Sequence, residues 1–299
     1  MIASKQMGWK KKMKEFFFNH VSPTPKGVFY LLTHTLLTLL LPLSFLLLAS
    51  ISGAQYYLQT LDLYHSPQPF SFLFTFAINI NPCVLYVLVS IVSIATLIQG
   101  LTGKITLLSE SSSSSSTTVL KPGLYTAWLL LCTFQVCVGL GIEGSIGAGV
   151  YDYISDDSSF GVERSLISRV IFMLGLHETT QVWSRMVVRP VVNDTVFGIE
   201  RKERWIEKVA VAASLGTLWW LRLRDEVETL VVMTEVKKEQ LMDVGMSDFV
   251  GWWLYYLTVT IGMVRIVKGL MWMFMISLCR RRATRISSTV ESSDNDDKV

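Results

Sequence analysis

Apolar residues in this chain gather into long blocks, and they do not follow the period of a strand or of an amphipathic helix. Four blocks are close to 20 residues long or longer, the length that a helix needs to cross about 30 Å of hydrocarbon. They occupy residues 27–52, 83–101, 123–142 and 249–279. The pattern predicts an all-α, multi-pass integral membrane protein.

Two further blocks are weaker candidates for spans. Block 166–188 is apolar but contains ionisable side chains, and block 205–221 has only the minimum length of about 17 residues. Trp205 and the pair Trp219-Trp220 bracket the second block, as aromatic residues do at membrane interfaces. Counting both gives about six transmembrane helices. In the alternative, four helices span and these two lie at the interface or re-enter, which leaves both chain ends on one side.

Charge in the flanking segments predicts the orientation. Residues 1–26 carry six lysines and one glutamate, loop 189–204 is basic, and loop 143–162 has acidic residues and no base. Short basic loops stay in the cytoplasm, so we expect both termini to be cytoplasmic. Because the first span follows a long basic segment rather than a short one, it resembles an uncleaved signal-anchor.

The chain divides into a transmembrane domain and polar segments. Residues 27–279 form the helical domain, which follows the basic cytoplasmic segment 1–26. The serine run within 109–118 cannot bury a core and predicts a flexible loop, and 280–299 predicts a disordered cytoplasmic tail. Pro82 disfavours a helix at the residue before it, so the aromatic segment 70–81 is interpreted as an interfacial lead-in to the second span.

Composition supports a membrane location and offers little for chemistry. The chain is 51% apolar and 17% charged, whereas soluble domains average about 25% charged. Its four cysteines lie in or beside apolar blocks, and its histidines are isolated, so we expect no disulfide framework and no metal site. The sequence Gly139-x-Gly141-x-x-Gly144 closes a helix instead of following a strand, which argues against a dinucleotide site. We therefore expect no enzyme, no cofactor and no nucleic-acid partner.

Charged side chains within the spans are the candidate functional residues, because each costs about 2.5–3.5 kcal/mol to insert. Glu178 and Arg185 share one face of a helix but lie about 10 Å apart along its axis, too far to pair. Glu178 therefore needs Arg265 or Lys268, which predicts a buried polar contact between blocks 166–188 and 249–279. Arg169 lies on nearly the opposite side of its helix from Glu178. The candidate set is Arg169, His177, Glu178, Gln181, Arg185, Arg265 and Lys268.

One segment resembles known proteins. Arg185-Met-Val-Val-Arg-Pro-Val-Val-Asn-Asp-Thr-Val-Phe-Gly198 is similar to a segment of uncharacterised multi-pass transmembrane proteins of plants. The resemblance implies a membrane protein and brings no activity with it. We expect this stretch to form a cytoplasmic loop.

These observations lead to three hypotheses of function. The first is a non-enzymatic structural or interaction component, whose partners are the lipid bilayer and either other membrane proteins or a second copy of the chain. The second is a small transporter or channel subunit with a polar path around Glu178 and Arg265, and the third is a lipid enzyme that uses His177 and Glu178. The expected location is the endoplasmic reticulum or the plasma membrane.

Overall fold

The computed structural model of the 299-residue chain describes residues 25–62, 72–103, 122–147, 166–194, 205–239 and 245–291. These ranges are helical and contain no strand. The predicted flexible loop 109–118 and nearly all of the basic segment 1–26 lie outside them. The longer elements are α2 (Pro25–Asp62), α3 (Phe72–Thr102), α4 (Pro122–Gly147), α6 (Leu166–Trp183), α8 (Trp205–Leu218), α10 (Thr229–Glu239) and α11 (Met246–Glu291).

Within the described ranges, four helices are long and apolar enough to cross a membrane. Their apolar stretches are Pro25–Gly53, Pro82–Thr102, Gly123–Ile142 and Met246–Cys279. They coincide with the four strong blocks of the sequence, because length and continuous hydrophobicity define both. The prediction of an all-α, multi-pass membrane protein is confirmed.

Helix α3 begins before its apolar stretch. It starts at Phe72 and passes through Pro82 without ending, so the expected break before Pro82 is wrong. Proline removes one backbone hydrogen bond from a helix, and membrane helices tolerate that loss when neighbouring groups satisfy the freed carbonyl.

The segment 166–194 is one helix with a local change of pitch. Helix α6 continues into a π-helical turn, η1 (Ser184–Val188), and then into α7 (Arg189–Val192). Pro190 lacks an N–H, and its ring would clash with a carbonyl one turn earlier in a regular α-helix. The wider π turn accommodates it, and the Arg189 N–H donates to the Ser184 carbonyl. The loop predicted from residue 189 therefore begins too early.

The part of the resembling segment that the structure describes, residues 185–194, is likewise helical and not a loop. Its valines 187, 188, 191 and 192 are buried, so this apolar side belongs to the core.

The predicted block 205–221 is helical and extends further than expected. Helix α8 continues into a second π turn, η3 (Trp219–Leu223), and into α9 (Arg224–Glu226). The segment 222–248, which lies between the last two predicted blocks, contains α10, which packs on α2 and α11.

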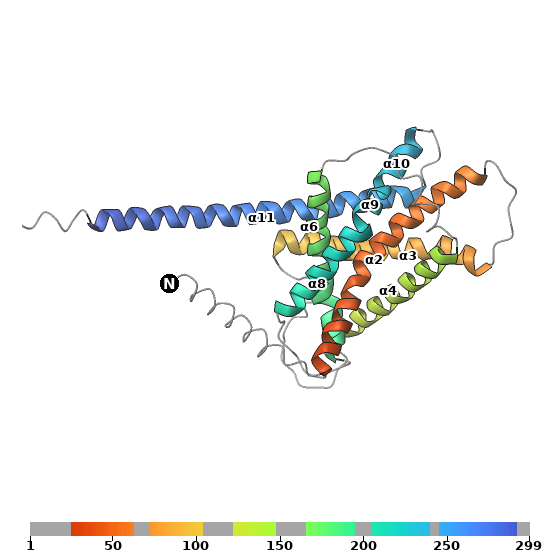
Figure 1. The fold of residues 1–299 in the computed structure, drawn as a ribbon, viewed down its shortest axis with the longest axis horizontal. Helices are drawn as coiled ribbons and strands as arrows, with labels where there is room; N and C mark the ends of the chain where they lie inside the picture. Colours follow the sequence, from red (N-terminus) through yellow and green to blue (C-terminus); the bar gives the residue numbers. More distant parts are fainter. Residues whose placement is uncertain are drawn as a thin grey trace, which may run out of the picture.

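Helix α11 is the longest element, with 46 residues. It continues to Glu291, so the expectation of disorder is wrong for residues 280–291. Its first half packs on α6, α3 and α10, and its second half extends alone away from the other helices (Figure 1).

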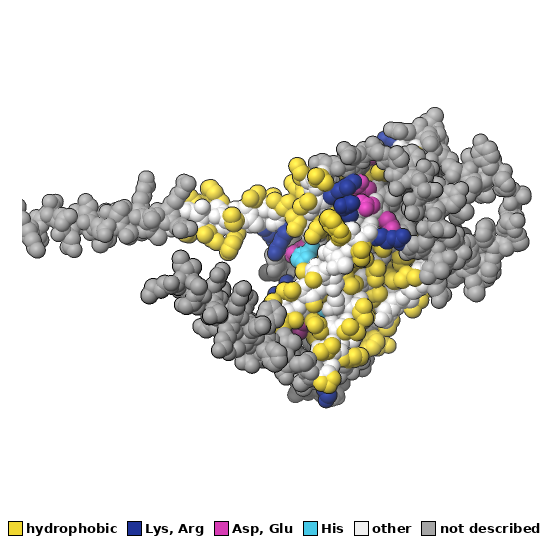
Figure 2. Space-filling model, viewed as in Figure 1, with side chains coloured by type: hydrophobic (Ala, Val, Ile, Leu, Met, Phe, Trp, Pro, Cys, Tyr) yellow, Lys and Arg dark blue, Asp and Glu magenta, His cyan; other side chains and the backbone are white. Residues whose placement is uncertain are grey.

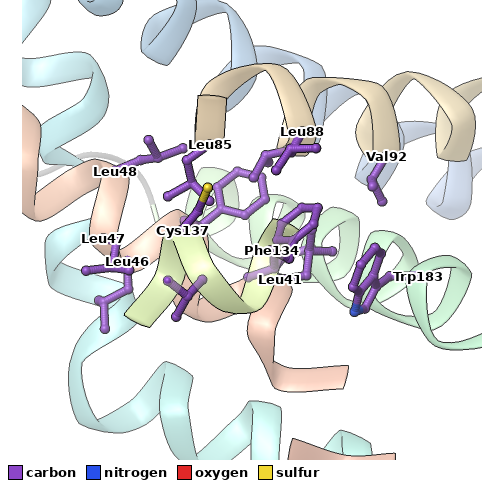
Figure 3. Close-up of a cluster of buried hydrophobic side chains, with 14 of the residues drawn as sticks. Leu41, Leu46, Leu47, Leu48, Leu85, Leu88, Val92, Phe134, Cys137 and Trp183 are labelled. Atoms are coloured by element: carbon purple, nitrogen blue, oxygen red, sulfur yellow. The ribbon is translucent and has the colours of Figure 1, made fainter. Parts of the chain in front are cut away.

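The core lies where α2, α3, α4 and the end of α6 meet (Figure 3). Trp183 is fully buried, and its ring centroid is 4.6 Å from that of Phe134. Its indole Nε1 donates to the Leu37 carbonyl at 3.1 Å, which satisfies the one polar atom of the side chain. This aromatic contact joins α2, α4 and α6.

Helices α6 and α11 cross at a steep angle (Figure 1), where Gly175 lies against Thr258 and Gly262 against Ile171. The hydroxyls of Ser168 and Tyr255 lie 3.3 Å apart near the start of α6, and the pair Glu178–Arg265 lies farther along both helices.

Helix α2 runs in the opposite direction to α6. The Tyr30 hydroxyl donates to the Asn193 side chain at 3.1 Å near the start of α2, whereas Phe45, farther along, contacts Phe172 near the start of α6.

Candidate functional site

The crossing of α6 and α11 depends on two glycines. A Cβ built on Gly175 would overlap the carbonyl oxygen of Thr258, and one on Gly262 would overlap that of Ile171. The absence of side chains lets the two backbones touch, as small residues do in membrane helix pairs. This close approach brings the polar residues one turn farther along into contact.

Glu178 and Arg265 meet just beyond this crossing. The Arg265 Nε lies 3.5 Å from a Glu178 carboxylate oxygen, so the contact predicted between the two blocks is present. It is less buried than expected, because 61% of the Arg265 side chain and 27% of the Glu178 side chain remain uncovered by protein. The crossing angle turns Arg265 outward, toward lipid or water.

Lys268 lies one turn beyond Arg265 and contacts α3 instead of Glu178. Its ammonium group donates to the Gly100 carbonyl, near the C-terminus of α3. Gly103 ends that helix with a φ of 69°, a conformation that favours glycine. A cation at this position compensates the negative end of the helix dipole.

A cavity of about 190 Å³ lies between α3, α6 and α11. Its polar lining combines charged residues from the prediction with neutral residues from α3. The lining residues with polar side chains are Thr96, Gln99, Glu178, Arg265 and Lys268. The site therefore contains two cations, one carboxylate, an amide and a hydroxyl.

The remaining predicted residues lie elsewhere or have other roles. The Arg169 guanidinium donates to both carboxylate oxygens of Glu228, at 2.6 and 2.9 Å. Arg185 is exposed, while His177 and Gln181 are half-buried and do not line the cavity. The structure thus brings together Glu178, Arg265 and Lys268 and separates them from Arg169 and Arg185.

Sequence reasoning missed the contributions of α3 and of the segment after α8. Gln99 and Thr96 are ordinary residues at the end of an apolar block, and only the packing of α3 on α11 places them at the cavity. Glu228 lies 59 residues from Arg169. Glu178 was identifiable because a carboxylate in an apolar block demands a partner.

A second buried polar contact joins α10 to the start of α11. The Lys237 ammonium donates to the Asp248 carboxylate at 2.8 Å, and the two side chains are only 2% and 3% exposed. The Gly245 N–H donates to the same carboxylate oxygen at 3.2 Å. This pair closes the connection between α10 and α11.

No group of three or more His, Cys, Asp or Glu side chains is placed to hold a metal ion within the described ranges. Comparison of the chain with models of protein families, with curated proteins and with solved structures finds no match. The interpretation of the site therefore depends on its own geometry.

Proposed function

We propose that the protein is a non-enzymatic structural component of a membrane, which crosses the bilayer six times and assembles with a second copy of itself through α11. The observation that carries this proposal is the apolar surface of the α11 extension, defined as Leu270–Leu278. Its bulky apolar side chains are 45–67% exposed. These residues are Leu270, Met271, Trp272, Met273, Phe274, Met275, Ile276 and Leu278.

The extension is apolar around its whole circumference and stands clear of the other described helices (Figure 1). Contiguous apolar surface of this kind marks protein or membrane contacts. The apolar stretch Met246–Cys279 has 34 residues, about 50 Å as a helix, against roughly 30 Å of hydrocarbon. Lipid alone therefore covers this helix only if it tilts steeply.

A second copy is the occupant that suits the extension best. All copies insert with the same orientation, so each presents its extension at the same depth in the bilayer. Two identical segments can then form an isologous contact about a twofold axis along the membrane normal. The methionines favour such a contact, because their flexible side chains adapt to irregular surfaces.

Six spans with both ends in the cytoplasm are supported by the helix directions. Together, α6, η1 and α7 extend over about 40 Å, and α8 to α9 over about 33 Å. Both lengths are sufficient to cross hydrocarbon. The opposite courses of α2 and α6 are those that the first and fourth of six alternating spans require.

Counting subunits in lipid tests the self-association. We expect fluorescently labelled protein, diluted in liposomes, to bleach in two steps, and the double variant Trp272→Ala/Phe274→Ala to bleach mainly in one step. Removing two large rings eliminates much of the packing that drives helix association in lipid. A matched control is Tyr125→Ala/Leu129→Ala on α4, where the exposed fractions are 66% and 62%.

The control variant should retain two-step bleaching. Single-step bleaching of the unmodified protein at every density, or equal loss in both variants, would contradict the proposal.

The transporter alternative is supported by the cavity beside Glu178 and Arg265. The charges of α6 and α11 favour the structural role, because they serve contacts between helices: Arg169 with Glu228, Glu178 with Arg265, and Lys268 with the α3 carbonyl. Solute or ion flux into proteoliposomes, abolished by Glu178→Gln, would favour transport.

A further inference from the structure

The cavity at the end of α3 has the charge of an anion site. Two cations, Arg265 and Lys268, and one carboxylate, Glu178, line its volume of about 190 Å³. Basic, acidic and histidine side chains gather on the surface where α11 leaves the other helices (Figure 2). A water molecule occupies about 30 Å³ in the liquid, so the space exceeds the needs of one or two waters.

Both cations retain donors for a ligand. A guanidinium has five N–H donors in a rigid fork, and the contact of Arg265 with Glu178 involves its Nε. An ammonium has three donors, and one from Lys268 serves the Gly100 carbonyl. Planar guanidinium and ammonium groups together are the usual partners of phosphate oxygens.

The lining also provides acceptors. The Gln99 Oε1 is buried and has no hydrogen-bond partner within the described part of the chain. This oxygen is sealed from the cavity, so the acceptor that a ligand can reach is the Glu178 carboxylate. The Glu178 side chain is 27% exposed, and a carboxylate has free lone pairs for the hydroxyl groups of a ligand. Acceptors next to cations fit a ligand that contains both a phosphate and hydroxyl groups.

We propose that this cavity binds the phosphate and hydroxyl groups of an anionic polyol headgroup of a membrane lipid. The phosphate contacts Arg265 and Lys268, and a hydroxyl donates to the Glu178 carboxylate. The apolar side chains of Leu97, Val182 and Val264 line the same cavity and give the acyl chains an apolar surface beside the cations. In the proposed topology, α3 ends at the cytoplasmic face, where anionic lipids are enriched.

Native mass spectrometry of the full chain in detergent tests the site. We expect phosphatidylinositol to bind at least tenfold more tightly than phosphatidylcholine, and the variant Arg265→Gln/Lys268→Gln to lose that preference. Arg222→Gln is the matched control, since its side chain is 44% exposed and its ion pair with Glu226 lies on another helix. The control should bind phosphatidylinositol as the unmodified protein does.

A variant of the acceptor separates recognition of hydroxyls from simple attraction of charge. Glu178→Ala should weaken binding of phosphatidylinositol several-fold and should not weaken binding of phosphatidic acid, which lacks the polyol. Equal binding of phosphatidylcholine, or unchanged binding in the double variant, would overturn the proposal. Saturable competition by inorganic phosphate at equal concentration would assign the site to the free anion and overturn the lipid assignment.

Discussion

Charged side chains in these helices pair across elements, and the degree of burial differs greatly between pairs. Lys237–Asp248 is almost fully covered by protein, Arg169–Glu228 is partly covered, and Arg265 in the pair with Glu178 is 61% exposed. Burial sets the consequence of losing one partner, because a stranded charge is expensive only where water cannot reach it.

Removal of one partner from Lys237–Asp248 should be strongly destabilising. Lys237→Met leaves the buried carboxylate unpaired, and we expect a loss of about 3–5 kcal/mol in unfolding free energy. The double variant Lys237→Met/Asp248→Asn should recover much of it, because no buried charge remains. Thermal unfolding in detergent, followed by tryptophan fluorescence, measures both. Arg224→Gln is the control, since its pair with Asp225 is exposed. A loss in Lys237→Met no larger than in Arg224→Gln would contradict this account.

The pair Glu178–Arg265 should contribute less. Because Arg265 is largely exposed, we expect Arg265→Glu or Glu178→Arg alone to cost about 1 kcal/mol or less. The swapped double variant should restore stability if the two side chains interact. Thermal unfolding of the unmodified protein, the two single variants and the double variant gives the four stabilities that a double-mutant cycle needs. Additive losses, with no recovery in the swap, would rule out the interaction.

For individual residues, the sequence predicted the contact between Glu178 and Arg265, because an unpaired charge in an apolar block is costly. It could not predict Arg169–Glu228 or Lys237–Asp248, because both depend on how the segment after α8 folds back on the other helices. The sequence also overestimated the burial of Arg265, because the position of a residue in an apolar block does not determine the angle at which the two helices cross.

Among the elements, the contact between α6 and α11 is the closest backbone approach that the glycine positions reveal. Sequence patterns identified the helices through their length and hydrophobicity, and missed the boundaries that tertiary packing sets. The pair Ala212 and Gly216 has the small-residue spacing typical of packed membrane helices, yet a Cβ on Gly216 has nothing within 4 Å. The sequence around Gly175 and Gly262 has a less regular pattern of small residues, and only the folded structure shows that the two glycines pack together.

Substitution at the two kinds of glycine should therefore differ. Gly175→Leu forces α6 and α11 apart, and we expect it to abolish folding or lower the unfolding temperature by at least about 10 °C. Gly216→Leu enters open space and should be nearly neutral. The amount of monodisperse protein in detergent and its unfolding temperature check both. Similar losses at the two positions would contradict the proposed crossing.

For the whole molecule, hydrophobicity was sufficient to predict an all-α, multi-pass protein. The four long blocks are helices that can span, and the two weaker blocks are continuous helices lengthened by π turns. The sequence could not reveal the straight extension of α11, because the basic residues after Cys279 resemble the start of a disordered tail as much as the continuation of a helix.

The central claim is that α6 and α8 cross the bilayer together with the four longer helices. Labelling of single cysteines from one side of sealed vesicles tests it most directly, in a background where the four native cysteines are serine. With six spans, Lys202→Cys should react with an impermeant maleimide only from the cytoplasmic side, and Asp156→Cys only from the opposite side. Reaction of both cysteines from the same side would show that α6 does not cross, and would contradict the six-span account.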